Sequence, residues 1–200
     1  MSKSTASKTD TLRRAMVGTA ARWLPQRGMA AVNLIEVARA VGAPRGSIYH
    51  YFPQGRDQLL SEAMSLASFS GLRMIQKAAS DAKSVDSFIQ TIFDTSVMQI
   101  GGKDFSGGCP VGAAVMSAEV ESAAIQAEFQ AAFAAWDTAL CTAFMALGIP
   151  TKKQARELAN CTLIAYEGAL VCAKGARNPM MFISATRMVK AIAASMLVRA

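Results

Sequence analysis

Residues 33–52 read Asn-Leu-Ile-Glu-Val-Ala-Arg-Ala-Val-Gly-Ala-Pro-Arg-Gly-Ser-Ile-Tyr-His-Tyr-Phe, and this stretch predicts two short helices separated by a tight turn. Apolar residues recur at helical spacing in its first half. Asn33 is expected to cap the first helix, with Glu36 reaching back to it in a capping box. Gly42 supplies the left-handed conformation that ends this helix. Ile48 then places an apolar side chain where the second helix crosses the first, which is the arrangement of a helix-turn-helix.

The second helix of this pair is expected to turn a polar surface outward. Pro44 suits its first position, and at about 100° per residue Pro44, Arg45, Tyr51 and Phe52 fall within roughly 60° of Ile48. The outward surface and its flanks carry Gly46, Ser47, Tyr49 and His50, with Arg45 at the start. These residues are small or rich in hydrogen-bond donors, which suits contact with the major groove of DNA. A helical hairpin whose polar face only meets water is the alternative.

The same residues resemble the signature of TetR-family transcriptional regulators. The match consists of Gly-Ser-Ile-Tyr-His-Tyr-Phe at residues 46–52 followed by Arg-Asp-Gln-Leu at residues 56–59, within a resemblance that covers residues 8–60. The resemblance implies a DNA-binding unit of three helices and a role for Arg56 in gripping the DNA backbone. Many relatives carry a serine or threonine at the position of Pro44, so one phosphate contact of the family is weakened here. The residues expected to contact DNA are Asn33, Arg45, Gly46, Ser47, Tyr49, His50, Tyr51 and Arg56.

A second, shorter resemblance is to the LmrA/YxaF-like subgroup of that family. It rests on Gly-Cys-Pro-Val at residues 108–111 and on Phe-Pro-Gln-Gly at residues 52–55, which has an extra residue before Arg56. Cys109 directly precedes a predicted helix start, where the helix dipole lowers the pKa of a thiol. A role in sensing redox conditions or electrophiles is therefore an alternative to a half-buried packing residue.

The basic charge of the chain is concentrated near the helix-turn-helix. Residues 1–60 hold nine Lys or Arg and three Asp or Glu, a balance of +6, whereas the whole chain has a net charge of +7. A basic segment joined to a nearly neutral one indicates a polyanionic partner such as double-stranded DNA. A basic solvated surface without a partner is the alternative.

The remainder of the 200 residues predicts only helices. The expected ranges are 8–26, 56–79, 84–100, 110–119, 121–147, 151–174 and 179–198. No alternation of period two appears, so the fold class is all-α. We expect residues 1–55 to form an N-terminal three-helix bundle that binds DNA and residues 56–200 to form a C-terminal helical domain for effector binding and dimerisation. No Gly-, Ser- or Pro-rich linker separates them, which favours rigid coupling.

Composition and motifs exclude several other classes. Hydrophobic residues make up 52% of the chain and charged residues 18%, which indicates a folded protein. No apolar run reaches the ~18 residues of a membrane span, and the polar N-terminus lacks the apolar core of a signal peptide. A cytoplasmic protein without a membrane partner is expected. The four cysteines do not cluster as metal ligands, and the single histidine lies on the predicted DNA-facing surface, so we expect no enzyme, no cofactor and no metal site.

Aromatic and methionine side chains are spread over the predicted helices of the second domain. Such side chains adapt to irregular apolar shapes, and the resemblance implies an effector-binding domain of this size. The residues expected to line an effector pocket are Phe69, Phe93, Met98, Met116, Phe129, Phe133 and Trp136. Because few charged residues are available as anchors, a lipophilic or aromatic effector is expected. The alternative for each residue is an ordinary place in the core.

The last two predicted helices carry the pattern of a dimer interface. The first has a face of small residues and the second a broad apolar stripe, so two such helices from each subunit are expected to form a four-helix bundle. The expected interface residues are Ala165, Gly168, Ala169, Cys172, Met188, Ile192 and Met196. An intramolecular core accounts for part of this pattern equally well.

Together these features predict a homodimeric, DNA-binding transcriptional regulator. By resemblance it is expected to be a repressor that a small molecule releases from a palindromic operator. Its two recognition helices are expected to enter major grooves about 34–36 Å apart or a small multiple of that spacing. A redox- or electrophile-responsive regulator that acts through Cys109 and a sequence-indifferent structural DNA-binding protein are the alternatives.

Overall fold

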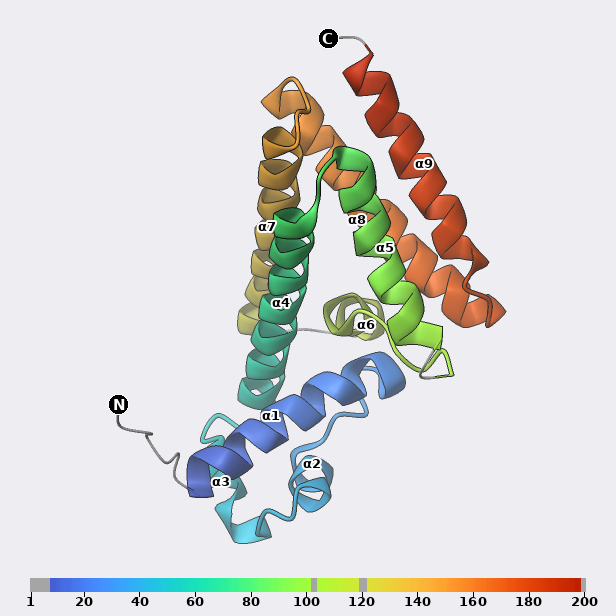
Figure 1. Ribbon diagram of the computed structural model, residues 1–200. Coiled ribbons are helices and arrows are strands. Elements are labelled where there is room, and N and C mark those ends of the chain that lie inside the picture. The colour runs from blue at the N-terminus through green and yellow to red at the C-terminus, as the bar shows by residue number, and fades with distance from the viewer. Residues whose placement is uncertain (1–7, 102–103, 119–121, 199–200) are drawn as a thin grey trace. The chain divides into compact units, whose positions relative to one another are not determined.

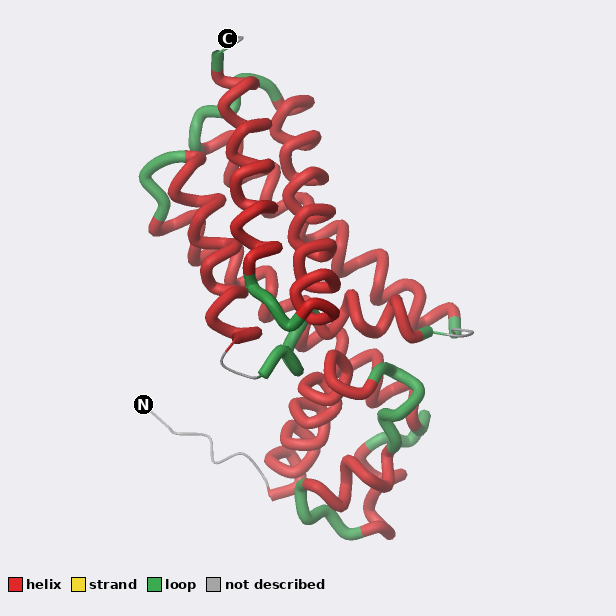
Figure 2. Tube along the Cα trace, turned by 90° about the vertical axis from the view of Figure 1, so that its right-hand side faces the viewer, coloured by secondary structure: helices red, strands yellow, loops and turns green. Residues whose placement is uncertain are grey.

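The computed structural model describes residues 8–101, 104–118 and 122–198, and every regular element in these ranges is a helix, as Figure 1 shows. The predicted all-α fold class is confirmed. The elements in chain order are α1 (Lys8–Arg27), α2 (Leu34–Ala40), the 3₁₀ helix η1 (Arg45–Ser47), α3 (Ile48–Tyr51), α4 (Arg56–Asp81), α5 (Val85–Gly101), α6 (Pro110–Ser117), α7 (Ala123–Ala146), α8 (Lys152–Ala176) and α9 (Met180–Leu197). Residues 119 and 121, where two predicted helices end and begin, lie outside the described ranges. Figure 2 shows that loops make up a small part of the described trace.

The chain folds into two compact units. The first consists of residues 1–67 and 110–130, and the second of residues 68–109 and 131–200. The helices α4 and α7 therefore contribute residues to both units, and α6 belongs to the first. These units are defined by packing alone, so the functional division predicted between residues 55 and 56 stays a prediction.

The core of the first unit is built from α1, the helix-turn-helix and the first turns of α4. Met16 and Leu24 of α1, Val37 of α2 and Leu59 of α4 are completely buried. Complete burial of a side chain of this kind stabilises the fold by about 1.5–3 kcal/mol. The helix α6 packs along α1 and completes this unit.

The turn between the two helices of the motif has the predicted conformation in its first half. Gly42 has φ 70°, so the left-handed conformation that ends α2 is confirmed. The second half differs from the single helix predicted, because the backbone after Pro44 begins with the 3₁₀ turn η1 and becomes α-helical only at Ile48. Pro44 has an extended ψ of 135° and its side chain makes no cap hydrogen bond. The first turn is closed instead by the Ser47 N–H, which donates to the Pro44 carbonyl at 3.0 Å.

The second unit is organised around α9, which packs against both α8 and α5 (Figure 1). Its interior is rich in aromatic contacts, such as the edge-to-face pair of Phe88 and Phe144 with ring centroids 5.3 Å apart. By length and composition α9 is apolar enough to cross a membrane. One of its faces, which includes Phe182 and Val189, is buried in the unit. A helix that packs into a core has the same composition, so this feature alone is weak evidence for a membrane span.

Candidate nucleic-acid interface

The polar surface predicted for the second helix of the motif is formed by η1 and α3. It consists of Arg45, Gly46, Ser47, Tyr49 and His50. Tyr49 is 71% exposed and its neighbour His50 is exposed as well, whereas Ile48 between Ser47 and Tyr49 is only 4% exposed. The buried Ile48 anchors the short helix and leaves the side chains around it in solvent. The expected placement of these five residues is thus present, and their contact with DNA stays a prediction.

Two arginines of the motif are available for phosphate groups. Arg45 at the start of η1 and Arg39 on α2 are exposed, and neither guanidinium group has a hydrogen bond or ion pair among the described residues. Arg39 is not among the DNA contacts predicted from the sequence. Its position on α2, on the side opposite the buried Val37 and Ala38, is the sequence feature that could have identified it as exposed. Unpaired guanidinium groups on an exposed surface suit bidentate contacts with phosphate.

Tyr51 differs from the other predicted DNA contacts because it lies in the core. Its side chain is only 7% exposed. The backbone carbonyl of Tyr51 accepts a hydrogen bond from Arg13 Nε at 3.3 Å. The helical angle places Tyr51 on the same side as Ile48, which the structure confirms, and a contact of Tyr51 with DNA stays a prediction. Its main role in the described structure is to pack the end of α3.

Asn33 is exposed and acts as the N-cap of α2, as predicted. Its Oδ1 accepts hydrogen bonds from the Ile35 N–H at 2.8 Å and the Glu36 N–H at 3.1 Å. In a capping box the Glu36 side chain would accept a hydrogen bond from the Asn33 N–H. Here the Glu36 carboxylate instead forms an ion pair with the guanidinium of Arg27, at 3.8 Å. An N-cap of this type contributes about 1 kcal/mol. Asn33 therefore has a structural role as the cap of α2. Its contact with DNA stays a prediction.

Arg56 has protein partners that the sequence interpretation did not foresee. Its Nε donates to the Val32 carbonyl at 2.9 Å, and its Nη2 donates to the Met29 carbonyl. The side chain thereby ties the first turn of α4 to the loop that precedes α2. Because its guanidinium is held by backbone carbonyls, Arg56 acts here as a clamp within the first unit. The backbone-gripping role implied by the family resemblance stays a prediction.

The residues predicted to line an effector pocket are divided between the two units and differ in burial. Met116 and Phe129 belong to the first unit, and the other five belong to the second. Met98 and Met116 are exposed, whereas Phe93 and Trp136 are buried. Trp136 donates from Nε1 to the Ser68 carbonyl at 2.9 Å, so it is held in the core of the second unit. Phe93 and Trp136 are packed in the interior of the second unit, and the role of the seven residues in an effector pocket stays a prediction.

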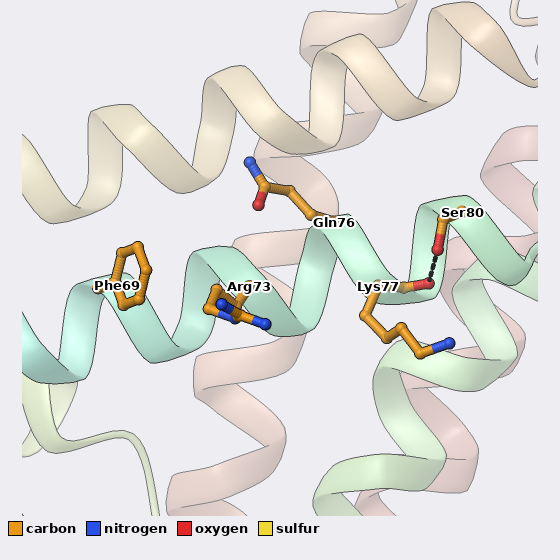
Figure 3. A pocket seen from close by; sticks show the side chains of 5 residues that line it. All are labelled: Phe69, Arg73, Gln76, Lys77 and Ser80. Carbon is orange, nitrogen blue, oxygen red and sulfur yellow. Dashed lines mark hydrogen bonds between the residues drawn. The ribbon is translucent and has the colours of Figure 1, made fainter. Parts of the chain in front are cut away.

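A surface hollow of about 420 Å³ lies along α4 in the second unit (Figure 3). It is lined by Phe69, Arg73, Gln76, Lys77 and Ser80. The Arg73 guanidinium carbon lies 5.9 Å from the centroid of the exposed Phe69 ring. Figure 3 also shows the Ser80 hydroxyl, which donates to the Lys77 carbonyl at 2.8 Å. Of the predicted pocket residues only Phe69 lines this hollow, and its other walls are polar.

A polar cluster between α5, α8 and the loop before α6 was not found from the sequence. The hydroxyls of Ser96 and Tyr166 are hydrogen-bonded at 2.7 Å, and Ser96 is buried. Burial raises the pKa of the Tyr166 phenol well above its usual range. Burial also raises the pKa of the Glu167 carboxyl, and the hydrogen bond from the Cys109 thiol opposes this shift. Helical periodicity places Tyr166 and Glu167 on α8, but only the tertiary fold brings Ser96 and Cys109 to them.

The residues predicted to form a dimer interface fall into two groups. Ala165, Ala169 and Met196 are buried within the second unit, so their assignment to an exposed face is corrected. The physical reason is that α8 and α9 pack against each other in the same chain, which is the intramolecular alternative stated above. Gly168, Cys172 and Met188 are exposed and Ile192 is half-buried. Beside them lie exposed Ile164 and Val171, which the sequence interpretation had not included.

Comparisons with known proteins agree with the resemblances found in the sequence. The family of bacterial regulatory proteins of the tetR type matches residues 17–63, and the C-terminal domain of LmrA/YxaF-like transcriptional regulators matches residues 86–188. An uncharacterized HTH-type transcriptional regulator of Mycobacterium tuberculosis, Rv0196, is 36% identical over 171 residues, which cover 83% of this chain and 86% of the relative. The HTH-type transcriptional regulator LmrA of Bacillus subtilis is 22% identical over 174 residues, which cover 86% of this chain and 92% of LmrA.

Solved structures share the fold at low sequence identity. A TetR transcriptional regulator from Legionella pneumophila has a TM-score of 0.79 and 16% identity, and the match covers 94% of this chain and 98% of that one. The reduced form of Escherichia coli NemR has a TM-score of 0.74 and 19% identity, with 90% and 96% of the two chains covered. At this identity the likeness concerns the fold alone.

Proposed function

The chain belongs to the TetR family of bacterial transcriptional regulators, and on that premise we propose that it acts in the cytoplasm as a homodimeric repressor that a small lipophilic or aromatic effector releases from a palindromic DNA operator. The observation that carries the proposal is the surface of η1 and α3. There Tyr49 and His50 are exposed around a buried Ile48. A short helix that is anchored on one side and polar on the other suits the major groove.

The DNA contacts divide into two kinds in this proposal. Ser47 of η1 and Tyr49 and His50 of α3 read base edges or neighbouring phosphates, and Gly46 permits close approach of the backbone. Arg45 and Arg39 bind phosphates, because both are exposed and unpaired among the described residues. The balance of +6 in residues 1–60 supports the same orientation toward a polyanion.

Dimerisation is proposed to use the outward faces of α8 and α9. Ile164 is 73% exposed, and Val171 on the same side of α8 is exposed too. The exposed Gly168 between them permits close approach of a second helix. Met188 adds an exposed apolar side chain from α9. A two-fold dimer doubles the DNA contact of one short recognition helix, which by itself buries little surface.

Release by an effector is proposed to change the spacing of the two recognition helices. The helix α4 contributes residues to both compact units, so a displacement of its second half is carried into the unit that holds the motif. An effector shifts the equilibrium only by its difference in affinity for the two geometries, typically about 1–3 kcal/mol. The apolar and aromatic interior of the second unit favours a lipophilic or aromatic molecule.

Cys109, the thiol considered as a redox or electrophile sensor, has an acidic side chain as a hydrogen-bond partner. The thiol donates a hydrogen bond to the Glu167 carboxyl. Reactive cysteines are found beside positive groups. The proposal therefore keeps a noncovalent effector as the releasing signal.

The proposal is tested by selection of bound duplexes from a random library with the purified full-length protein. We expect a consensus with two symmetric half-sites, because a two-fold dimer places its two recognition helices in equivalent grooves. Selected duplexes without any shared sequence would instead indicate the sequence-indifferent structural protein. A single half-site without symmetry would contradict the homodimer.

A further inference from the structure

One residue in the loop before the helix-turn-helix, Met29, is held through both of its backbone polar groups by two helices that are distant in sequence. The Met29 N–H donates to Ser117 Oγ of α6 at 2.8 Å. The Met29 carbonyl accepts from Arg56 Nη2 of α4. Both contacts lie within the first compact unit. The N–H of Met29 is thus held by α6, and its carbonyl is held by α4.

The contact with α6 is close enough to constrain the backbone. Gly28 has φ 73°, and a Cβ atom added there would lie 3.0 Å from the Ser117 Cβ. The Ser117 hydroxyl also donates to the Ala113 carbonyl at 2.7 Å, one turn earlier in α6. Its oxygen is therefore oriented by its own helix while it accepts the Met29 N–H. The last turn of α6 and residues 28–29 fit each other both sterically and through a hydrogen bond.

Arg56 of α4 contacts the same loop at a second position, Val32, three residues after Met29. Arg56 Nε donates to the Val32 carbonyl at 2.9 Å, and Val32 is completely buried. Asn33, the next residue, caps α2, which in turn contacts η1 and α3. Residues 29–32 therefore connect α4 and α6 directly to the start of the helix-turn-helix.

We infer that Ser117 and Arg56 are positioning residues, which set the orientation of the helix-turn-helix through the peptide groups of Met29 and Val32. Neither acts by touching DNA in this inference. The helix α6 follows directly on Cys109, which belongs to the second unit, so α6 is a covalent route by which a change there reaches Met29. This regulatory part of the inference rests on the proposed function, whereas the positioning part rests on the contacts alone.

The test compares wild type with Ser117→Ala, which removes the acceptor of the Met29 N–H without adding atoms. Hydrogen exchange of the Met29 amide is expected to become faster by at least about five-fold, since one hydrogen bond is lost. Affinity for a duplex selected by the wild-type protein is expected to fall by roughly three- to ten-fold. Thr142→Ala is the matched control, because the Thr142 hydroxyl likewise donates one turn back, to Thr138, on an exposed surface of α7. It is expected to leave both readouts unchanged.

A second pair of variants tests the steric part of the contact. Gly28→Ala is expected to weaken binding of the selected duplex, because its φ is positive and its new Cβ meets Ser117. Ser117→Gly removes that Cβ neighbour together with the hydroxyl, so Gly28→Ala is expected to weaken binding less in the Ser117→Gly background than in the wild-type background. Independent effects of the two substitutions would overturn the assigned contact.

The outcomes separate this inference from the proposed function. If the wild-type protein selects no duplex, the proposed function fails, and the exchange of the Met29 amide still decides the positioning role. Unchanged Met29 exchange in Ser117→Ala overturns the positioning role of Ser117. Faster exchange with unchanged affinity for the selected duplex overturns its influence on DNA binding.

Discussion

The guanidinium of Arg13 on α1 lies over the ring of Phe52 at the end of the recognition helix, with 5.3 Å between the guanidinium carbon and the ring centroid. The same guanidinium forms an ion pair with Glu62 of α4. Its Nε donates to the Tyr51 carbonyl at 3.3 Å. One side chain therefore connects α1 and α4 to the end of α3, and it fixes the helix that carries the outward-facing residues.

Arg13→Ala is expected to lower the free energy of unfolding by about 1–3 kcal/mol, because it removes a stacking contact and two hydrogen-bonded contacts together. Urea unfolding measures this change. Arg14→Ala is the matched control: Arg14 is exposed and its Nε donates to the Asp10 carbonyl of the same helix. The control is expected to stay within about 0.5 kcal/mol of wild type. Equal effects of the two substitutions would contradict the assigned role of Arg13.

Tyr49→Ala is expected to weaken binding of the selected duplex by a factor of roughly 5–150, the equivalent of about 1–3 kcal/mol for a base-reading contact. The melting temperature is expected to remain near that of wild type, because the side chain is exposed. Anisotropy titration and thermal unfolding provide the two readouts. Lys152→Ala, on an exposed residue at the start of α8, is the control. If both the melting temperature and the affinity for the duplex fall, Tyr49 contributes to the stability of the fold, and its role as a DNA contact is contradicted.

Glu167→Gln is expected to raise the melting temperature at pH 8 and to leave it nearly unchanged at pH 4. The pKa of the folded carboxyl is raised above its ordinary value of 4.5 by burial. In the wild-type protein the protonated Glu167 therefore makes its full contribution to the free energy of unfolding below that value. This contribution to stability is lost as the pH rises through the folded pKa. The Gln variant has no charge to bury. An advantage of the variant that is the same at both pH values would contradict the assignment.

Ile164→Glu is expected to convert the proposed dimer into monomers, because it places a charge on an exposed apolar face of α8. Sedimentation velocity over a range of protein concentrations measures the change. Helical content is expected to be retained, since the side chain is exposed in the single chain. Thr142→Glu, on an exposed position of α7, is the control and is expected to stay dimeric. A dimer that survives Ile164→Glu would place the interface elsewhere.

The helix-turn-helix was predictable because its signals are local. Asn33, Gly42 and Ile48 act through their own backbone conformation or their helical face, and each has the expected role in the structure. Arg56 was harder to predict, because its partners, the carbonyls of Met29 and Val32, lie more than twenty residues earlier. Sequence position at a helix start indicates that a side chain is available, but it does not identify a partner brought there by the fold.

The helices of the second unit were predictable from the sequence. Which of their residues are exposed, and which form the polar contacts, was less predictable. Helical periodicity identifies an apolar face, but it does not tell whether the same chain or a second copy covers that face. Ala165 and Ala169 are covered by their own chain, whereas Ile164 and Gly168, on the other side of α8, are exposed. The contacts of Ser96 with Tyr166 and of Cys109 with Glu167 arise only when α5, α8 and the loop before α6 come together.

The most direct test of a sequence-specific regulator is a competition titration, followed by fluorescence anisotropy, between the selected duplex and a scrambled duplex of the same composition. We expect a preference for the selected duplex of about 10³-fold or more at fixed salt. Affinity is also expected to fall steeply as the salt concentration rises. Equal affinity for the two duplexes would contradict a sequence-specific regulator.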